Sequence, residues 1–307
     1  MSNLTLVLNP YAGKGAGRGL RGRIVEKIRS RTSDFELIET TRPREGTEIA
    51  RNTSSHVVVA VGGDGTVHEV ANGILGSGKV LGVLPIGSGN DFVKSIGIPS
   101  SLDDSISALI SGRTALIDVG MVEIEKSADD LNPVHGGKSC FVNGLGIGFD
   151  AAVAIRTQQF RFVSGTLVYV LAVLQTLGRY VPPEFKVSVD QRVSNSRNLL
   201  VAIGNGRCAG GGFYLTPEAK VADGQLDLCI VEAISTMAIL RLMPLVMKGK
   251  HHNVHGVRFE RGECITVEAS NPTAVHADGE ILGGRISRLG VRVVPRAMSV
   301  IVGPSYS

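Results

Sequence analysis

The sequence contains no tryptophan, and aromatic residues make up only 5% of its 307 residues. Proteins that bind single-stranded nucleic acid stack the bases on aromatic side chains. The shortage of aromatic side chains therefore argues against nucleic acid as a partner. The net charge of +4, from 32 basic and 28 acidic residues, is too small to indicate a polyanionic ligand by itself.

Cysteine is also scarce, with four residues and no CxxC pair. Cys140, Cys208, Cys229 and Cys264 lie far apart, so neither a disulfide framework nor a thiolate zinc site is expected. Reduced thiols are typical of a cytoplasmic protein. The first apolar run, Leu4 to Leu8, is too short for a signal peptide and follows no basic segment. These features predict a cytoplasmic protein.

Long apolar runs are rare as well. Phe162 to Gly178 carries no charge over 17 residues, but this length is at the lower limit for a membrane span and polar residues dilute it. A helix that is buried or lines a cleft is the better interpretation. Thr236 to Lys248 predicts an amphipathic helix that packs on the second domain or touches a bilayer.

Glycine, in contrast, is abundant, with 39 residues, about twice the usual share of roughly 7%. The most informative stretch is His56 to Gly73, HVVVAVGGDGTVHEVANG. Val57 to Val61 predicts a buried strand, and apolar residues at helical spacing follow from Thr66. A strand, a glycine turn and a helix present backbone N–H groups to a phosphate. Asp64 lies inside this turn, where flexibility alone requires no acid.

Strands and helices alternate from the N-terminus to about residue 112, which predicts a parallel sheet with helices on both faces. The strand Val80 to Leu84 leads into a second glycine turn, Gly87 to Phe92. Because ligands bind at the carboxyl ends of parallel strands, both glycine turns belong to one candidate site. After Ile117 the pattern changes to repeated short strands separated by turn residues, which predicts an antiparallel second domain.

Positive charge is concentrated between Lys14 and Arg31, where seven basic residues stand beside one acid. One interpretation is a solvated helix face. The other is a surface that attracts phosphate or an anionic membrane. The sequence leaves both open.

The second half contains three polar groups of residues. Asp223-Gly224 indicates either a hairpin turn or a cation site with backbone carbonyls as further ligands. The segment His276 to Glu280, HADGE, holds two acids, either of which could act as a general base if it faces a cleft. The cluster of His251, His252 and His255 lacks the ligand spacing of a zinc site and is expected to be a solvated linker.

These motifs together resemble the diacylglycerol kinase catalytic domain, which bacterial lipid kinases and sphingosine kinases share. The resemblance rests on GGDGTVHEVANG (62–73) and LPIGSGNDF (84–92), with LVLNPYAGKG before them and the glycine block 204–228 and HADGE after them. The order of these motifs covers the chain almost from end to end. The GGDGT turn also occurs in NAD kinases and phosphofructokinases.

The resemblance implies an ATP-dependent lipid kinase that uses Mg²⁺. The positions that match the ATP site of the family are Asn9, Pro10, Gly13, Thr40, Gly62, Gly63, Asp64, Gly65, Thr66, Val67, His68, Ser88 and Asn90. Asp223, with the carbonyls of Lys220 and Gln225, matches a structural magnesium site. Glu280 matches the proposed proton acceptor, and Asp64 and Asp278 are the further catalytic candidates.

The resemblance also implies a fold. We expect a doubly wound parallel sheet, like that of NAD kinase and phosphofructokinase, in residues 1–118 with a returning segment 294–307. An antiparallel β-sandwich that binds the lipid is expected in residues 119–293. The resemblance further implies a homodimer that acts at a membrane surface, with Lys14, Arg18 and Arg161 at its membrane-facing rim. The loop Lys126 to Lys138 reads as an insertion.

The acceptor remains open between diacylglycerol, phosphatidylglycerol, sphingoid bases and isoprenoid alcohols. Two other classes of function also remain. An NAD-kinase-like enzyme would phosphorylate a soluble dinucleotide, and a non-catalytic regulator would bind ATP without turnover.

Overall fold

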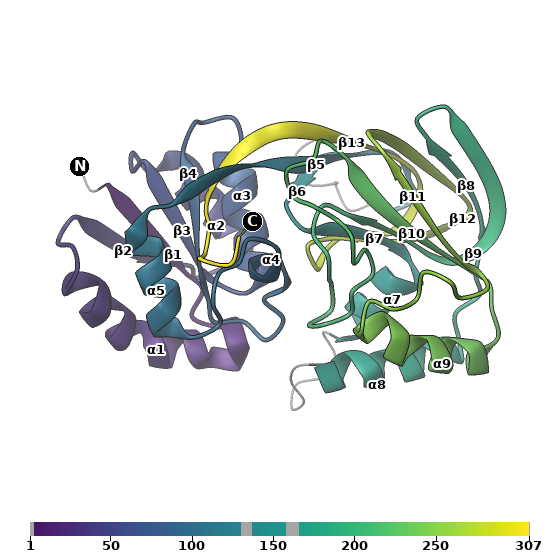
Figure 1. Cartoon of the computed structure of the whole chain (residues 1–307), viewed down its shortest axis with the longest axis horizontal. Coiled ribbons are helices and arrows are strands. Elements are labelled where there is room, and N and C mark those ends of the chain that lie inside the picture. Colours follow the sequence, from purple (N-terminus) through teal and green to yellow (C-terminus); the bar gives the residue numbers. More distant parts are fainter. Residues whose placement is uncertain (1–2, 130–136, 158–165, 307) are drawn as a thin grey trace. The chain divides into compact units, whose positions relative to one another are not determined.

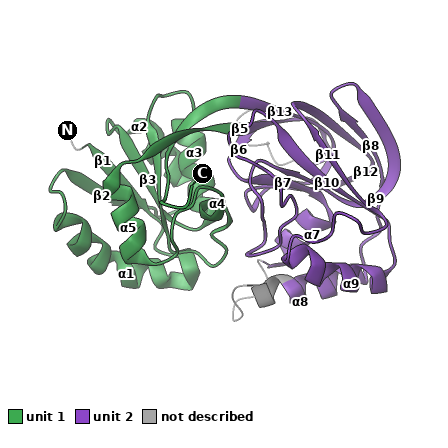
Figure 2. Cartoon of the chain, in the orientation of Figure 1, with its two compact units in different colours: residues 1–118, 295–307 green, residues 119–294 purple. Residues whose placement is uncertain are grey.

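The structure is a computed structural model that describes residues 3–129, 137–157 and 166–306, without the side chains of 166–169. Two compact units make up the chain (Figure 2). Unit 1 comprises Met1–Asp118 and Pro295–Ser307, and unit 2 comprises Val119–Val294. The predicted role of Arg161 and most of the predicted insertion 126–138 lie outside the described residues.

Unit 1 is built on a parallel sheet. Its strands are β1 (Leu4–Leu8), β2 (Phe35–Glu39), β3 (Val57–Gly62) and β4 (Val80–Pro85), in the order β4-β3-β1-β2. The end of β13 (Glu280–Ile301) adds a further parallel strand, in which Ser299 pairs with Val80. Every residue of β1 and β4 is buried, as expected for parallel strands that are covered on both faces.

Five helices accompany this sheet (Figure 1). They are α1 (Ala12–Arg29), α2 (Glu45–Asn52), α3 (Asp64–Ile74), α4 (Asp91–Ser95) and α5 (Leu102–Ser111). Helices α2 and α3 pack closely on each other, because a Cβ on Gly73 would lie 2.7 Å from the Cβ of Ala50. Helix α5 packs on β4 and also contacts α1.

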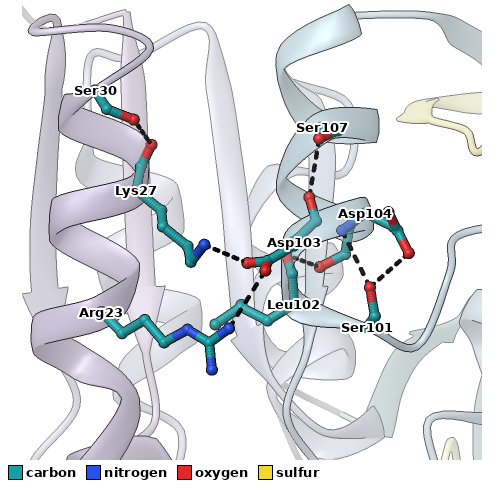
Figure 3. Close-up of polar contacts among 9 residues, drawn as sticks. Arg23, Lys27, Ser30, Ser101, Leu102, Asp103, Asp104 and Ser107 are labelled. Atoms are coloured by element: carbon teal, nitrogen blue, oxygen red, sulfur yellow. Dashed lines mark hydrogen bonds and ion pairs between the residues drawn. The ribbon is translucent and has the colours of Figure 1, made fainter.

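Part of the basic run on α1 forms ion pairs with α5 (Figure 3). Lys27 Nζ lies 2.7 Å from Asp103 Oδ1, and Arg23 Nη2 lies 3.3 Å from Asp103 Oδ2. Arg21 pairs with Glu39 of β2. These pairs are exposed and contribute little to stability. They show that this part of the run has protein partners, so it is not simply a solvated helix face.

Unit 2 is predominantly antiparallel. Its strands are β5 (Thr114–Ser127), β6 (Lys138–Phe141), β7 (Gly144–Gly148), β8 (Glu184–Val189), β9 (Arg192–Gly204), β10 (Leu226–Glu232), β11 (Val257–Gly262), β12 (Cys264–Ala277) and most of β13. Its described helices are α7 (Phe149–Thr157), α8 (Thr166–Leu177) and α9 (Thr236–Met247).

The strands of unit 2 are covered on two faces. Along β9, Val201 and Ile203 belong to the core between the strands, whereas Leu200 and Ala202 belong to a second core that includes residues of α7, α8 and α9. This alternation follows from the period of two in a strand. The end of β9, residues 199–203, therefore reads as a continuous apolar run, whereas its first residues, 192–197, are mostly polar and exposed.

Several expectations need correction. The sequence pattern predicts a glycine-rich loop from Tyr11 to Gly19 and a helix from about Leu20, but helix α1 begins at Ala12, with non-helical angles at Gly13, Lys14 and Gly15. The apolar run from Ser139 to Ile147 predicts a single strand, but the structure has two strands there, β6 and β7. Helix α7 was not expected. The prediction that His251 lies in a solvated linker is wrong, because its side chain is 0% exposed and packs against Phe259.

The two apolar segments form helices, as predicted. These are α8 and α9, and within the described ranges no helix is long and apolar enough to cross a bilayer. In α8, Ala172 and Val173 are buried while Leu174 is 47% exposed. Residues 162–165 of the first segment lie outside the described part.

Candidate functional site

Three loops of unit 1 approach each other through glycine. A Cβ on Gly87 would lie 2.4 Å from the Cα of Gly63, and a Cβ on Gly13 would lie 2.3 Å from the carbonyl oxygen of Ile86. Neither position can hold a side chain without displacing the other backbone. The loops after β1, β3 and β4 therefore meet backbone to backbone at the carboxyl edge of the sheet, where a phosphate is expected to bind.

The side chain of Asp64 ties two of these loops together. Its Oδ1 accepts hydrogen bonds from the backbone N–H groups of Asp91, at 2.8 Å, and Phe92, at 3.2 Å. Asn90 closes the second loop on itself, since Gly87 N donates to its Oδ1 and its Nδ2 donates to Gly87 O. Both acidic and amide side chains thus fix the shape of the glycine loops.

The remaining predicted ATP residues fall into two groups. Asn9 and Thr40 follow the ends of β1 and β2: Asn9 Oδ1 accepts from Tyr11 N at 2.9 Å, and Thr40 N donates to Leu8 O at 2.9 Å. Pro10 is buried beside Asn9, and its carbonyl accepts from Arg18 N. Ser88 is exposed on the second loop.

The second group lies in the first turns of α3 and is buried. Thr66 is 4% exposed, Val67 3% and His68 8%. Val67 N already donates to Gly63 O, and the amide Nδ2 of Asn72 donates to His68 O. A ligand would therefore meet this segment through the first N–H groups of α3, around Asp64 and Gly65, rather than through these three side chains.

In unit 2 the HADGE segment forms the turn between β12 and β13. Asp278 and Gly279 have φ of 50° and 88°, the combination that a two-residue type I′ hairpin requires. The carboxylate of Asp278 accepts from the backbone N–H groups of Val142, Asn143 and Gly144 at 2.9–3.1 Å.

The two acids of this turn therefore differ in role. Asp278 is 6% exposed and fastens the turn to the segment before β7. Glu280, the first residue of β13, is exposed. This difference favours Glu280 over Asp278 as a group that can reach a substrate hydroxyl.

The predicted metal residues lie on the loop before β10. Asp223 Oδ1 accepts from Gln225 N at 3.2 Å, and Asp223 Oδ2 lies 3.9 Å from Arg261 Nη1. Lys220 is exposed, so only its carbonyl oxygen fits a cation. One carboxylate with two carbonyls is a donor set that suits Mg²⁺. Within the described residues, no cluster of three or more His, Cys, Asp or Glu side chains could hold a metal.

A small pocket, with a cavity volume of about 60 Å³, lies in unit 2 beneath its helices. Its lining is almost entirely apolar and includes Val173 of α8 together with Leu242 and Met243 of α9. Among the described residues that line it, Asp150 in the first turn of α7 is the one acidic residue.

Sequence reasoning missed Asp150, whose Oδ2 lies 2.9 Å from His276 Nε2. The two residues are 126 positions apart, so no local pattern joins them. The available signal was an acid directly after the glycine-rich turn of β7, a position where an apolar residue would otherwise continue the core.

Comparison with known proteins shows that both units match lipid kinase family models. Residues 3–122 match the diacylglycerol kinase catalytic domain, and residues 144–302, more than half of the chain, match the YegS C-terminal NAD kinase beta sandwich-like domain. The diacylglycerol kinase of Mycobacterium tuberculosis is 29% identical over 98% of this chain and 95% of its own. A protein of Enterobacter sp. named "Probable lipid kinase YegS-like" is 28% identical over 97% and 95%.

A solved structure of a diacylglycerol kinase from Bacillus anthracis superposes with a TM-score of 0.72, at 19% identity, and covers 100% of this chain and 98% of its own. At this identity the likeness concerns the fold alone. The family matches and the sequence relatives carry the assignment, which agrees with the resemblance of the glycine motifs and the HADGE turn. The chain belongs to the diacylglycerol kinase family of bacterial lipid kinases, in which a catalytic domain precedes a YegS-type β-sandwich domain, and it is a lipid kinase.

Proposed function

We propose that this lipid kinase transfers the γ-phosphate of ATP to the hydroxyl group of diacylglycerol, so that the products are phosphatidic acid and ADP. The observation that carries the proposal is the fastened turn of unit 2, on which Glu280 is exposed while Asp278 is held by three backbone N–H groups. The name of the Mycobacterium tuberculosis relative supports diacylglycerol as the acceptor.

The glycine loops of unit 1 support the binding of ATP phosphates. Their backbones approach within van der Waals distance at Gly63 and Gly87, so N–H groups rather than side chains would surround a phosphate. The N-terminus of α3, an 11-residue helix, adds its partial positive charge. In this proposal Asn9, Thr40 and Ser88 surround the remainder of the nucleotide.

Glu280 is the proposed general base. Its carboxylate accepts the proton of the lipid hydroxyl as the hydroxyl oxygen forms a bond to the γ-phosphorus. The bond from that phosphorus to the bridging oxygen breaks, and ADP leaves with this oxygen. Asp64 is the weaker candidate because its Oδ1 already accepts two backbone N–H groups.

Magnesium is the proposed cofactor of this reaction. It would neutralise phosphate charge during the transfer, which depends mainly on positioning and electrostatic stabilisation. A second, structural magnesium ion is proposed on Asp223 with the carbonyls of Lys220 and Gln225, because these oxygen donors lie within one short loop.

The apolar pocket under α8 and α9 is the proposed site for an acyl chain. Its lining includes apolar side chains such as Leu199, Phe213 and Leu242. Burial of a chain there would be favourable by roughly 0.8 kcal/mol for each CH₂ group. A soluble dinucleotide would gain nothing from such a lining, which argues against the NAD-kinase alternative.

Three further features belong to the proposal. A doubly wound arrangement is proposed for unit 1, supported by its parallel strands and the helices packed on them. Peripheral binding to a membrane surface is supported by the exposed apolar side chains of Leu174, Val181 and Met237. The homodimer that the resemblance implies remains a prediction.

The experiment that tests the proposal is phosphate transfer from radiolabelled ATP, with Mg²⁺, to lipids in mixed micelles. The panel contains diacylglycerol, phosphatidylglycerol, sphingosine and undecaprenol, with NAD as a soluble control. Label in phosphatidic acid alone is the expected result. Label in another lipid would replace the acceptor while leaving the lipid kinase in place, and label only in NADP would overturn the proposed function.

A further inference from the structure

Two ionisable side chains lie buried against each other beneath the turn that carries Glu280. The Nε2 atom of His276 lies 2.9 Å from Oδ2 of Asp150, and the two side chains are 7% and 3% exposed. His276 belongs to β12, and Asp150 belongs to the first turn of α7. Burying a carboxylate is unfavourable unless it has a hydrogen-bonding or charged partner. Packing alone therefore does not explain why two ionisable side chains are buried here.

The neighbouring strand leaves room for the pair. Gly146 of β7 is paired with His276 in the sheet. A Cβ on Gly146 would lie 2.2 Å from Asp150 Oδ2 and 2.3 Å from His276 Nε2. The two polar atoms therefore occupy the space over a glycine, so strand β7, strand β12 and helix α7 are all built around this contact.

The second ring nitrogen of His276 contacts the turn itself. Gly279 N donates to His276 Nδ1 at 3.2 Å. A nitrogen that accepts carries no proton, so the ring proton lies on Nε2 and is donated to Asp150. Asp150 thus selects the tautomer that allows the ring to hold the N–H group of Gly279, the residue directly before Glu280.

We propose that Asp150 and His276 are positioning residues of the lipid kinase, which act on the reaction by orienting the turn that presents Glu280. Asp278 holds this turn from the side of β7, and the ring of His276 holds it from beneath. The inference rests on the proposed role of Glu280 as the base. Asp150 also lines the apolar pocket, so it connects that pocket to the turn through His276.

The arrangement also makes the turn sensitive to pH. The charged groups that face the ring are Asp150 from α7, Asp278 from the turn and Glu280 from β13. Burial lowers the pKa of His276, but the attraction of these three carboxylates outweighs it and raises the pKa above its usual value of about 6.5. A ring protonated on both nitrogens cannot accept from Gly279. The turn therefore loses this hydrogen bond as the pH falls through the raised pKa.

Substitutions can separate the two contacts of the ring. In H276N the amide oxygen can occupy the position of Nδ1 and keep an acceptor for Gly279, whereas in H276Q the amide nitrogen can reach Asp150 but the acceptor is lost. D150N keeps the shape of the side chain and removes its charge. The matched control is D190N, because Asp190 Oδ1 also accepts two backbone N–H groups, at 3.0 and 3.1 Å, at the opposite end of β12.

The expected result is a loss in kcat without a loss in ATP binding. We expect D150N and H276Q to lower kcat about 10- to 100-fold, by analogy with the loss caused by removing outer-shell groups that orient metal ligands. The KM for ATP should stay within about twofold. H276N should retain more activity than H276Q. In both variants the acidic limb of the pH–rate profile should lie at lower pH than in the wild type. D190N should keep the wild-type kcat.

The decisive measurement is a double-mutant cycle with E280Q. If the pair acts through Glu280, D150N should change kcat by less than about twofold in the E280Q background. Equal losses in both backgrounds, or a D150N enzyme as active as the wild type, would overturn the inference and leave the proposed function intact. Wild-type turnover by E280Q itself would overturn both. Circular dichroism and thermal melts of each variant exclude unfolding as the cause of a loss.

Discussion

Glycine at position 87 is required by contact rather than by a turn angle. A Cβ there would lie 2.4 Å from the Cα of Gly63 and 2.8 Å from Asn90 Oδ1. We expect G87A to destabilise the protein by about 1–3 kcal/mol, as overpacking does, and to raise the KM for ATP about tenfold or more. Thermal melts and steady-state kinetics measure the two effects.

The control for this substitution is G19A. Gly19 lies on α1, and a Cβ there would meet nothing within 4 Å. Alanine stabilises a helix interior by roughly 0.5–1 kcal/mol relative to glycine. G19A should therefore melt at the wild-type temperature or above it, with an unchanged KM for ATP. An unchanged KM in G87A as well would contradict the account of the glycine loops.

His251 gives a pH-dependent prediction at the same scale. Burial lowers the pKa of His251 to about 4, below the unfolded value of about 6.5. Between these values the unfolded chain binds a proton that the folded protein does not, so the free energy of unfolding falls as the pH drops from 6.5 to 4. H251Q should show a smaller fall than the wild type in urea titrations across this range. The control H255Q, at an exposed histidine, should match the wild-type slope.

Among the elements, α8 offers the clearest test of the acyl pocket. Val173 lines the pocket, whereas its neighbour Leu174 is 47% exposed and does not. V173F should fill part of the pocket and raise the KM for long-chain diacylglycerol severalfold, with a smaller change for dioctanoylglycerol. L174F adds a phenylalanine outside the pocket and should leave both values unchanged. Equal effects on long and short chains would argue against the pocket as the acyl site.

Several elements could be predicted from the sequence because local patterns specify them. The sequence pattern predicts a strand from Phe35 to Glu39 and a helix from Glu45 to Asn52, and both have these bounds in the structure. The N-terminus of α1 could not be placed, because glycine and lysine with positive φ interrupt the helix within its first turn. Helix α7 follows a glycine-rich strand with no separating loop, so its short apolar pattern read as a continuation of the turn.

Only those parts of the candidate site that are continuous in the sequence could be predicted. The glycine loops and the HADGE turn are continuous segments, and both were identified. The roles within them depend on tertiary contacts: Asp278 accepts from Val142 to Gly144, and Asp150 meets His276, across more than 100 residues in each case. Likewise, His251 is buried through contacts with Cys229 and Phe259 on other strands. A single sequence does not show which distant residues form such pairs.

At the scale of the whole molecule, the two units have different proposed roles. Unit 1 supplies backbone N–H groups at the edge of a parallel sheet, which suits the phosphates of ATP. Unit 2 supplies an apolar pocket and an exposed carboxylate on a fastened turn, which suits a lipid hydroxyl. The central claim is that Glu280 accepts the proton of that hydroxyl.

The most direct test of this claim is the rate of label transfer from ATP to diacylglycerol by the wild type, E280Q and E263Q. Glu263 is an exposed glutamate at the other end of β12, so its substitution makes the same change in charge. Loss of a general base costs about 10²- to 10⁴-fold. We predict that E280Q forms phosphatidic acid at least about 100-fold more slowly than the wild type, with the same melting temperature, while E263Q is unaffected. Wild-type rates with E280Q would contradict the account.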